Sequence, residues 1–312
     1  MKKILILSVC LFVCWALPAQ QQRMKVACVG NSITYGTGLA DRATQSYPVQ
    51  LQKLLGEHYE VENFGKPGAT LLNQGHRPYT RQEEYRKALD FAGDIVVIHL
   101  GINDTDPRDW PNYRDSFVTD YLNLMDTFRK VNPDVRIIIA RMTPIADRHN
   151  RFLSGTRDWH GEIQTAIETV ARYAGVQLID FHEPLYPYPS LLPDAVHPTA
   201  EGAAIMAQTV YSAITGDYGG LQLSPLYTDN MVLQRDTPLL IHGTANVGEQ
   251  VTVRIDRQQW ITKAALDGKW SVKLSPLKAG GPYTLTISTP HRILKYTNVL
   301  IGEVWLCSGQ SN

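Results

Sequence analysis

The amino-acid sequence predicts an α/β fold built on a parallel sheet, followed by a smaller antiparallel β unit. From residue 24 to about 216, short apolar strands alternate with amphipathic helices, a pattern typical of a parallel sheet covered by helices on both faces. After Tyr218-Gly219-Gly220 the pattern changes: apolar and polar residues alternate with period two, and no long helical pattern follows before residue 300. This second pattern predicts a β-sandwich.

Five strands and five helices are predicted in the first unit. The strands are Lys25–Val29, Tyr59–Phe64, Asp94–Leu100, Arg136–Arg141 and Val176–Asp180. The helices are Tyr47–Gly56, Gln82–Phe91, Tyr113–Val131, Arg157–Ala174 and Thr199–Ile214. In the fourth helix the apolar residues recur at helical spacing, and Gly175 suits its carboxyl-terminal cap. The sequence does not determine the order of the strands in the sheet.

The second unit is predicted over residues 221–300. Apolar residues alternate through Val251–Ile255, Trp270–Leu274 and Tyr283–Ile287, and Asp267-Gly268 predicts a two-residue hairpin between its flanking strands. Residues 301–312 resemble another buried strand that runs into a turn, with Cys, Gly and Ser at the same offsets as in residues 28–32. We interpret them as the truncated start of a second catalytic domain.

The amino terminus is typical of an export signal. Lys2 and Lys3 precede an apolar run from Ile4 to Leu17, which is shorter than the roughly 20 residues that a membrane span needs. We expect cleavage after Ala19, so that residues 1–19 are lost and the protein is secreted, periplasmic or exposed on the cell surface. A lipid anchor at Cys14 is a less favoured alternative.

The charge balance argues against binding to nucleic acid or to an anionic membrane surface. The chain has 30 basic and 30 acidic residues, and loss of Lys2 and Lys3 leaves 28 against 30.

Cys28 and Cys307 remain after cleavage, both in apolar runs, which predicts two separate buried thiols rather than a disulfide. No later segment is long and apolar enough to predict a membrane span.

A serine at the end of the first strand is the leading candidate for chemistry. The apolar run Val26–Val29 ends at Gly30, and Ser32 follows in a small polar turn. The carboxyl ends of parallel strands are where such folds bind ligands. Three further polar segments follow predicted strands or precede the last helix, so the fold would bring them to the same edge; they are Asn63–Gly68, Gly101–Asp104 and Asp194–Pro198. Taken alone, Ser32 is equally consistent with a helix cap.

These residue types suit acyl transfer by a serine. A hydroxyl nucleophile needs a base within hydrogen-bond reach, and the base needs an orienting partner. His197 can be the base, and Asp194 lies three residues earlier. The backbone N–H groups of Ser32 and Gly68 and the side-chain amide of Asn103 can stabilise the oxyanion. The structural alternatives are a helix cap for Ser32, a structural histidine before a helix for His197 and a loop or cap residue for Asp194. For Gly68 and Asn103 the alternative is a turn-forming role.

In these four segments, over about residues 24–216, the chain resembles the SGNH (GDSL-like) hydrolases, a superfamily of esterases and lipases. The resemblance implies a flavodoxin-like three-layer fold, Ser32 as nucleophile, Asp194 and His197 as its triad partners, and Gly68 and Asn103 in the oxyanion hole. Many members carry Asp where this chain has Asn31, beside the nucleophile but outside the triad. The choice of Gly68 over Gly65 depends on how the glycine turn is aligned.

The second half is similar to the sialate O-acetylesterase family, in which a β domain precedes a catalytic domain of the SGNH type. The resemblance lies in Asp229–Arg235, Asp267–Trp270, Gly280–Tyr283 and Gly302–Asn312. Ser311 would match a second nucleophile, but its downstream histidine is absent from this sequence, so we expect Ser311 to be inert.

Together these observations predict a secreted serine esterase that removes O-acetyl groups from carbohydrate, with O-acetylated sialic acid as the leading substrate and other acetylated glycans as further ones. No cofactor is expected. The glycines of residues 30–38 lack the Gly-Lys-Ser/Thr of a phosphate loop, and the acidic residues near Asn103 lack the pattern of an EF-hand. The alternatives are a lysophospholipase or thioesterase of the same superfamily and a non-catalytic carbohydrate-binding protein.

Other aromatic and histidine residues leave their roles open. His99 lies in an apolar strand, which favours a core position. Tyr186, Tyr188 and Trp159 fall in predicted loops or near the start of a helix, where packing is favoured over stacking on a sugar. His160 and His182 have no assigned role.

Overall fold

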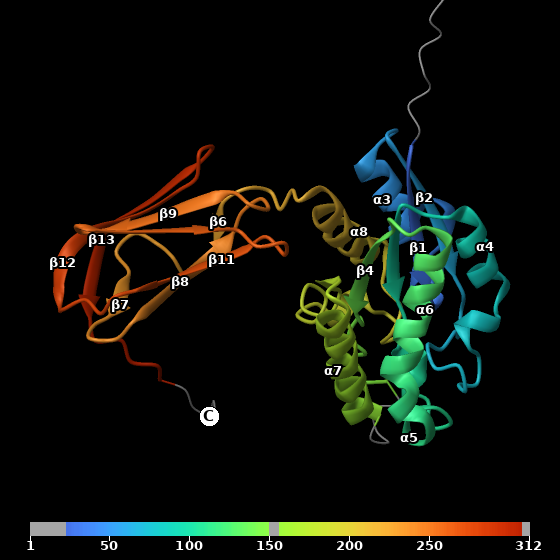
Figure 1. The fold of residues 1–312 in the computed structure, drawn as a ribbon. Helices are drawn as coiled ribbons and strands as arrows, with labels where there is room; N and C mark the ends of the chain where they lie inside the picture. The colour runs from blue at the N-terminus through green and yellow to red at the C-terminus, as the bar shows by residue number, and fades with distance from the viewer. Residues whose placement is uncertain (1–22, 150–155, 308–312) are drawn as a thin grey trace, which may run out of the picture.

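A computed structural model describes residues 23–149 and 156–307 (Figure 1). An α/β unit comes first along the chain and an all-β unit follows it. The predicted signal segment 1–19 and Ser311 lie outside the described residues.

The α/β unit is built on a five-stranded parallel sheet with the order β2-β1-β3-β4-β5. The strands are β1 Met24–Gly30, β2 Tyr59–Gly65, β3 Ile95–His99, β4 Arg136–Arg141 and β5 Gln177–Asp180. This is the flavodoxin-like strand order, which confirms the predicted fold class. The three central strands are apolar runs buried on both sides, because helices cover both faces of the sheet.

The longer helices form the two outer layers. They are α3 Tyr47–Leu55, α4 Glu83–Phe91, α6 Phe117–Val131, α7 Thr156–Ala174 and α8 Ala200–Thr215. Helices α3 and α8 pack together on one face, and α4, α6 and α7 lie side by side on the other, as right-handed crossovers require for this strand order. None of the helices in the described parts of the chain combines the length and the apolar character that crossing a bilayer requires.

Short helical turns lie in the connections that lead from a strand to the next long helix. They are α1 Ser32–Tyr35, α2 Arg42–Gln45, α5 Trp110–Tyr113 and the 3-10 turns η1 Tyr79–Arg81, η2 Ile102–Thr105, η3 Arg114–Ser116 and η5 Pro189–Leu191. Two of them, α1 and η2, directly follow the carboxyl ends of β1 and β3.

The all-β unit contains two sheets. Its strands are β6 Gln222–Leu223, β7 Val232–Gln234, β8 Leu239–Thr244, β9 Gln250–Ile255, β10 Gln258–Lys263, β11 Lys269–Leu274, β12 Gly280–Ser288 and β13 Ile293–Gly302. One sheet has the order β10-β9-β12-β13-β7 and the other β11-β8-β6. Pairing is antiparallel except between β13 and β7. The alternating apolar residues of β9 and β12 face a common core, as the sequence predicts.

The predicted hairpin at Asp267-Gly268 is wrong. The turn exists, with Gly268 N–H donating to the Ala265 carbonyl, but its flanking strands belong to different sheets. Strand β10 pairs with β9, whereas β11 pairs with β8. The turn is therefore a corner at which the chain passes from one sheet to the other.

The expectations for the last residues are also corrected where the structure describes them. Strand β13 ends at Gly302, and Trp305, Leu306 and Cys307 follow it as exposed, irregular chain. These residues have left the pairing with β7, so no sheet covers their side chains. Cys28 is buried as predicted, but Cys307 is not.

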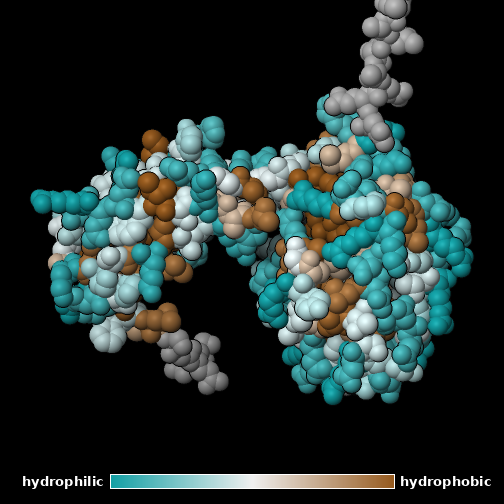
Figure 2. All heavy atoms as spheres, in the orientation of Figure 1, coloured by the Kyte–Doolittle hydropathy of each residue, from teal (hydrophilic) through white to brown (hydrophobic). Residues whose placement is uncertain are grey.

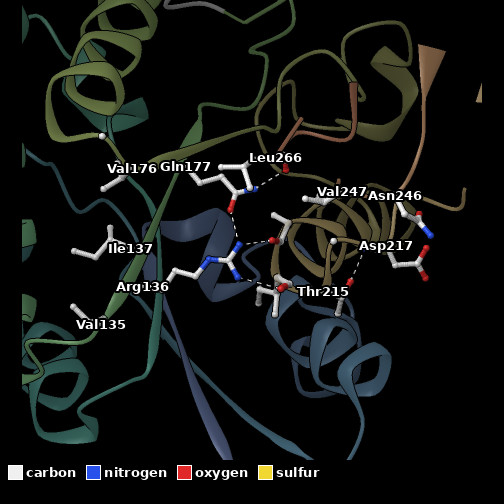
Figure 3. A pocket seen from close by; sticks show the side chains of 14 residues that line it. Val135, Arg136, Ile137, Val176, Gln177, Thr215, Asp217, Asn246, Val247 and Leu266 are labelled. Atoms are coloured by element: carbon white, nitrogen blue, oxygen red, sulfur yellow. Dashed lines mark hydrogen bonds between the residues drawn. The ribbon is translucent and has the colours of Figure 1, made fainter. Parts of the chain in front are cut away.

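The two units meet at the amino ends of β4 and β5, across the neck visible in Figure 2. A pocket of about 820 Å³ lies at this junction, and Figure 3 shows its side chains. The Arg136 guanidinium donates to the carbonyls of Ala213 and Ile214 at the end of α8 and to Gln177 Oε1. Gln177 Nε2 in turn donates to the Leu266 carbonyl of the all-β unit at 3.2 Å. The junction is thus held by a polar relay from the sheet to the second unit.

Candidate active site

Ser32 is placed by the tight connection between β1 and α1. Asn31 caps α1, its Oδ1 accepting the Ile33 N–H at 2.9 Å, and Ser32 is the first residue of the helix. A Cβ at Gly30 would lie 2.1 Å from Thr34 Oγ1 and 2.8 Å from the His99 carbonyl, so the turn requires glycine there. Ser32 is 8% exposed, which leaves its hydroxyl at the surface of an otherwise buried turn.

A continuous hydrogen-bond chain joins Ser32 to His197 and Asp194. Ser32 Oγ lies 2.8 Å from His197 Nε2, and His197 Nδ1 lies 2.6 Å from Asp194 Oδ2. With its proton on Nδ1, the imidazole donates to the carboxylate and accepts from the serine hydroxyl. The structure therefore brings together three residues predicted from sequence, across 165 positions between Ser32 and His197.

Asp194 also shapes the loop that carries His197. Its Oδ1 accepts the backbone N–H groups of Val196 at 3.0 Å and His197 at 2.7 Å. Partial burial opposes ionisation, but hydrogen bonds from the His197 N–H, the His197 ring and the Val196 N–H outweigh it, so the pKa of Asp194 lies below its usual value. The carboxylate is thus kept charged beside the imidazole. Thr199 then caps α8, its Oγ1 accepting the Gly202 N–H.

The glycine turn after β2 lies against the Ser32 turn. Lys66 N–H donates to the Gly30 carbonyl at 2.9 Å, and a Cβ at Gly65 would lie 2.2 Å from the Tyr35 nitrogen. Gly65 is therefore a close-packing position, and its N–H is bonded to Asn63 Oδ1 at 2.9 Å. Gly68 has a φ of 76°, which favours glycine. Of the two glycines, Gly68 is the better candidate for an oxyanion donor.

Asn103 meets the same turn from the end of β3. Its Nδ2 donates to the Ala69 carbonyl at 2.9 Å, next to Gly68. A carboxamide nitrogen carries two N–H groups, so this bond uses one and orients the other. The sequence placed Gly68 and Asn103 at the same edge, and this contact shows that the two segments touch.

Asp104 has a role that the sequence did not reveal. Its side chain is fully buried and accepts the N–H groups of Leu71 and Leu72, at 2.9 and 2.8 Å. Burial raises the pKa of Asp104 to about 7, although these hydrogen bonds lower it. Asp104 thereby fixes the segment after Gly68 to the segment that carries Asn103. In the sequence, the position of Asp104 directly after the candidate oxyanion residue Asn103 was the one feature that could have indicated this role.

Other titratable groups near the site have structural positions. His99 is fully buried against Phe181 with ring centroids 5.2 Å apart, and burial lowers its pKa to about 3. In the described parts of the chain, His76, Asp106 and Asp109 have ligand atoms within 4.8 Å of one another. Asp109 accepts the backbone N–H of His76, and its other oxygen lies 2.6 Å from His76 Nδ1. Asp106 forms an ion pair with Arg108. Contacts within the protein therefore explain why these three side chains lie together.

The site places a hydroxyl in hydrogen-bond contact with an imidazole, and a carboxylate contacts the other nitrogen of that imidazole. A glycine turn and a carboxamide lie beside them. On a flavodoxin-like sheet, this arrangement is typical of a serine acyl hydrolase. Comparison with known families agrees with that class. Residues 28–205 match the model of the GDSL-like Lipase/Acylhydrolase family. The match covers more than half of the chain, and the protein belongs to this family of carboxylic ester hydrolases.

Two groups of curated relatives are similar to the chain. An acetylxylan esterase of Xylanibacter ruminicola is 34% identical over 221 residues, which cover 64% of this chain and 45% of that protein. A sialate O-acetylesterase of Rattus norvegicus is 41% identical over 98 residues, covering 28% of this chain and 18% of that protein. The chain thus spans less than half the length of these relatives.

Solved structures give weaker likenesses. A carbohydrate acetylesterase from Xanthomonas citri is 37% identical over 29% of this chain and 21% of its own, with a TM-score of 0.29. A carbohydrate acetylesterase family member from Sinorhizobium meliloti is 19% identical over 61% of this chain and 97% of its own, with a TM-score of 0.49.

Proposed function

We propose that the protein is a serine esterase that removes O-acetyl groups from carbohydrate. The observation that carries the proposal is the hydrogen-bond chain from Ser32 Oγ through His197 to Asp194, at 2.8 and 2.6 Å. These are the distances at which a base can take the proton of an attacking hydroxyl.

The reaction proceeds in two halves. Ser32 Oγ attacks the acetyl carbonyl carbon while its proton passes to His197 Nε2, and the backbone N–H groups of Ser32 and Gly68 with the Asn103 amide stabilise the oxyanion. The C–O bond to the sugar then breaks, and His197 returns the proton to the sugar oxygen. Water, deprotonated by His197, attacks the acetyl-Ser32 ester. The bond from the acetyl carbon to Ser32 Oγ then breaks, His197 returns the proton to Oγ, and the acetyl group leaves as acetic acid, which ionises to acetate. Asp194 stabilises the imidazolium in both halves.

Acetylated xylan is the substrate that we place first, ahead of the O-acetylated sialic acid expected from sequence. The relative named for xylan matches 64% of the chain, whereas the relatives named for sialate match 28 to 30%. Both substrates present an acetyl ester on a sugar hydroxyl, so the chemistry at Ser32 is the same.

We also propose that residues 24–216 form the catalytic domain, residues 221–300 a separate β-sandwich domain and residues 301–312 the start of a second catalytic domain of the SGNH type. We further propose that the protein is exported. The charged start and apolar run of residues 2–17 support export. Amino-terminal sequencing of the protein from the producing cells tests this: the proposal expects a first residue of Gln20, and a chain that retains residues 1–19 contradicts it.

The function is tested by measuring acetate release from acetylated xylan and from O-acetylated sialic acid by wild type and by Ser32→Ala. We expect wild-type turnover and a fall in kcat of about 10⁶-fold in the variant. Turnover of a long-chain p-nitrophenyl ester in preference to the acetate ester would favour a lipase or thioesterase. An intact wild type that hydrolyses none of these esters would favour the carbohydrate-binding alternative.

A further inference from the structure

A second cavity lies near the candidate active site and has no part in the chemistry described above. It has a volume of about 550 Å³, within the range of roughly 300–1,000 Å³ typical of small-ligand sites. Its walls come from residues 144–147 after β4, from the start of α7, and from the loop between β5 and η5. The cavity therefore opens at the carboxyl edge of the sheet, as Ser32 does. We call it the Tyr186 pocket.

One wall of the Tyr186 pocket is a row of rings. The rings of His182 and Tyr186 are stacked, with centroids 5.2 Å apart and an angle of 20° between their planes. His160 follows at 5.8 Å from His182, and its Nε2 lies 3.0 Å from the Thr143 carbonyl. Burial lowers the pKa of His160 to about 4, so this part of the wall is neutral at pH 7. Tyr186 is 63% exposed although one face contacts His182, which leaves the rest of its ring accessible.

The other walls combine an acidic group, Asp147, and a basic group, Arg157, with partly apolar chain. Asp147 contributes an exposed carboxylate, and Ala146, Pro189 and Leu192 contribute apolar surface. A pyranose ring has C–H groups on its faces and hydroxyls around its rim, so it can stack on an aromatic face while its hydroxyls donate to a carboxylate. An acyl chain would leave these polar groups without partners, which disfavours a lipid in this cavity.

The pocket is joined directly to the loop that carries the candidate triad. Ala146 N–H donates to the Ala195 carbonyl at 2.8 Å, so the chain that lines the pocket is bonded to the residue between Asp194 and Val196. Leu192 lines the pocket two residues before Asp194. Ser32 and His197 are not among its lining residues. The cavity therefore suits a part of the substrate other than the acetyl group.

We propose that the Tyr186 pocket binds a sugar unit of a xylan-type chain, adjacent to the unit whose acetyl ester lies at Ser32. The inference rests on the proposed function for its link to catalysis, but the binding of sugar itself does not depend on turnover. The exposed ring of Tyr186 is the main contact, and loss of that ring weakens binding of the glycan without altering attack on the ester.

The binding test uses isothermal titration of xylotetraose into the full-length protein, comparing wild type with Tyr186→Ala, Tyr186→Phe and Tyr188→Ala. Tyr188 is a matched control, because it is an exposed tyrosine of the same loop, at 56%, and does not line the pocket. We expect a Kd about tenfold higher for Tyr186→Ala, as for loss of one stacking contact, and wild-type values for the other two variants. Equal affinity of wild type and Tyr186→Ala, or no binding by wild type, would overturn the proposal.

Kinetics separate this inference from the proposed function. On acetylated xylotetraose we expect Tyr186→Ala to raise KM about tenfold with kcat within about twofold, and on p-nitrophenyl acetate to leave both constants unchanged. An equal fall on both esters would instead give Tyr186 a role in holding the Asp194 loop and would contradict the subsite. If wild type hydrolyses neither ester, the proposed function fails, and the titration still decides whether the pocket binds sugar.

Discussion

The two ends of the parallel sheet use hydrogen bonds differently. At the amino end, the Arg136 guanidinium donates to two carbonyls at the end of α8 and to Gln177, which in turn donates to the Leu266 carbonyl of the second unit. At the carboxyl end, Asp194 and His197 are equally well bonded, but their chain of bonds ends on the Ser32 hydroxyl, which can react.

This difference shows that cavity size is a poor guide to chemistry in this protein. The junction pocket of about 820 Å³ is larger than the Tyr186 pocket of about 550 Å³, yet the Arg136 guanidinium in it donates to three protein acceptors (Figure 3). A reactive site needs a nucleophile that is hydrogen-bonded to a base able to take its proton. Of these two described sites, the carboxyl edge offers that arrangement, at Ser32.

The largest expected effect is at His197. His197→Ala removes the acceptor of the Ser32 proton, and we expect kcat for p-nitrophenyl acetate to fall by about 10⁶-fold. Because the two residues act as a unit, Ser32→Ala/His197→Ala should be no slower than either single variant. Steady-state kinetics with unchanged circular dichroism provide the measurement. Additive losses would mean that Ser32 and His197 do not share one step.

A smaller loss is expected at Asn103. Asn103→Ala removes one oxyanion donor and the bond to the Ala69 carbonyl, so kcat should fall by about 10²–10³-fold with little change in KM. Asn112→Ala, an exposed amide bonded to the Pro107 and Arg108 carbonyls, is the control and should keep wild-type kinetics. A variant Asn103→Ala that retains full kcat would exclude the amide from the oxyanion hole.

Asp104 predicts a pH dependence of stability. Its pKa is raised from 3.8 to about 7 in the folded protein, so its contribution to the free energy of unfolding is complete below about pH 4 and is lost as the pH rises to about 7. The slope is at most about 1.4 kcal/mol per pH unit, the value for one proton. Urea unfolding of wild type and Asp104→Asn measures it: the difference, wild type minus variant, should be larger at about pH 5 than at about pH 7.5. A difference that grows with pH would refute the assignment.

The smallest effect should be at the amino edge. Arg136→Ala removes partly buried hydrogen bonds to the end of α8 and is expected to lower the free energy of unfolding by about 1 kcal/mol while kcat stays within about twofold of wild type. Thermal unfolding and p-nitrophenyl acetate kinetics measure the two effects. A large fall in kcat would show that the two ends of the sheet are coupled, and the contrast between them would be wrong.

Much of the fold follows from local pattern. Central strands of a parallel sheet are buried on both faces, so β1, β3 and β4 are nearly continuous apolar runs and were predicted to within two residues. Ser32 and Asn103 follow the ends of β1 and β3, and Gly68 follows the edge strand β2, so position along the chain alone places all three at one edge of the sheet. The sequence could not show the bond from Asn103 to Ala69 that connects two of these segments.

The errors arose where a long-range partner decides the outcome. Asp267-Gly268 does form a turn, but no local signal says that β11 pairs with β8 rather than β10. The apolar residues up to Cys307 are typical of a strand, yet pairing stops at Gly302 and leaves them exposed. Asp104 is similar: its partners, Leu71 and Leu72, are more than thirty positions away, so its role depends on the folded structure.

The central claim is that Ser32 is an activated nucleophile, and covalent labelling tests it most directly. The full-length protein is incubated with a fluorophosphonate, and the modified peptide is mapped by mass spectrometry, with His197→Ala as the control. We predict a single phosphonylated serine at Ser32, together with loss of esterase activity, and a much slower reaction in the variant. Labelling of another serine, or equal labelling of wild type and His197→Ala, would contradict the account.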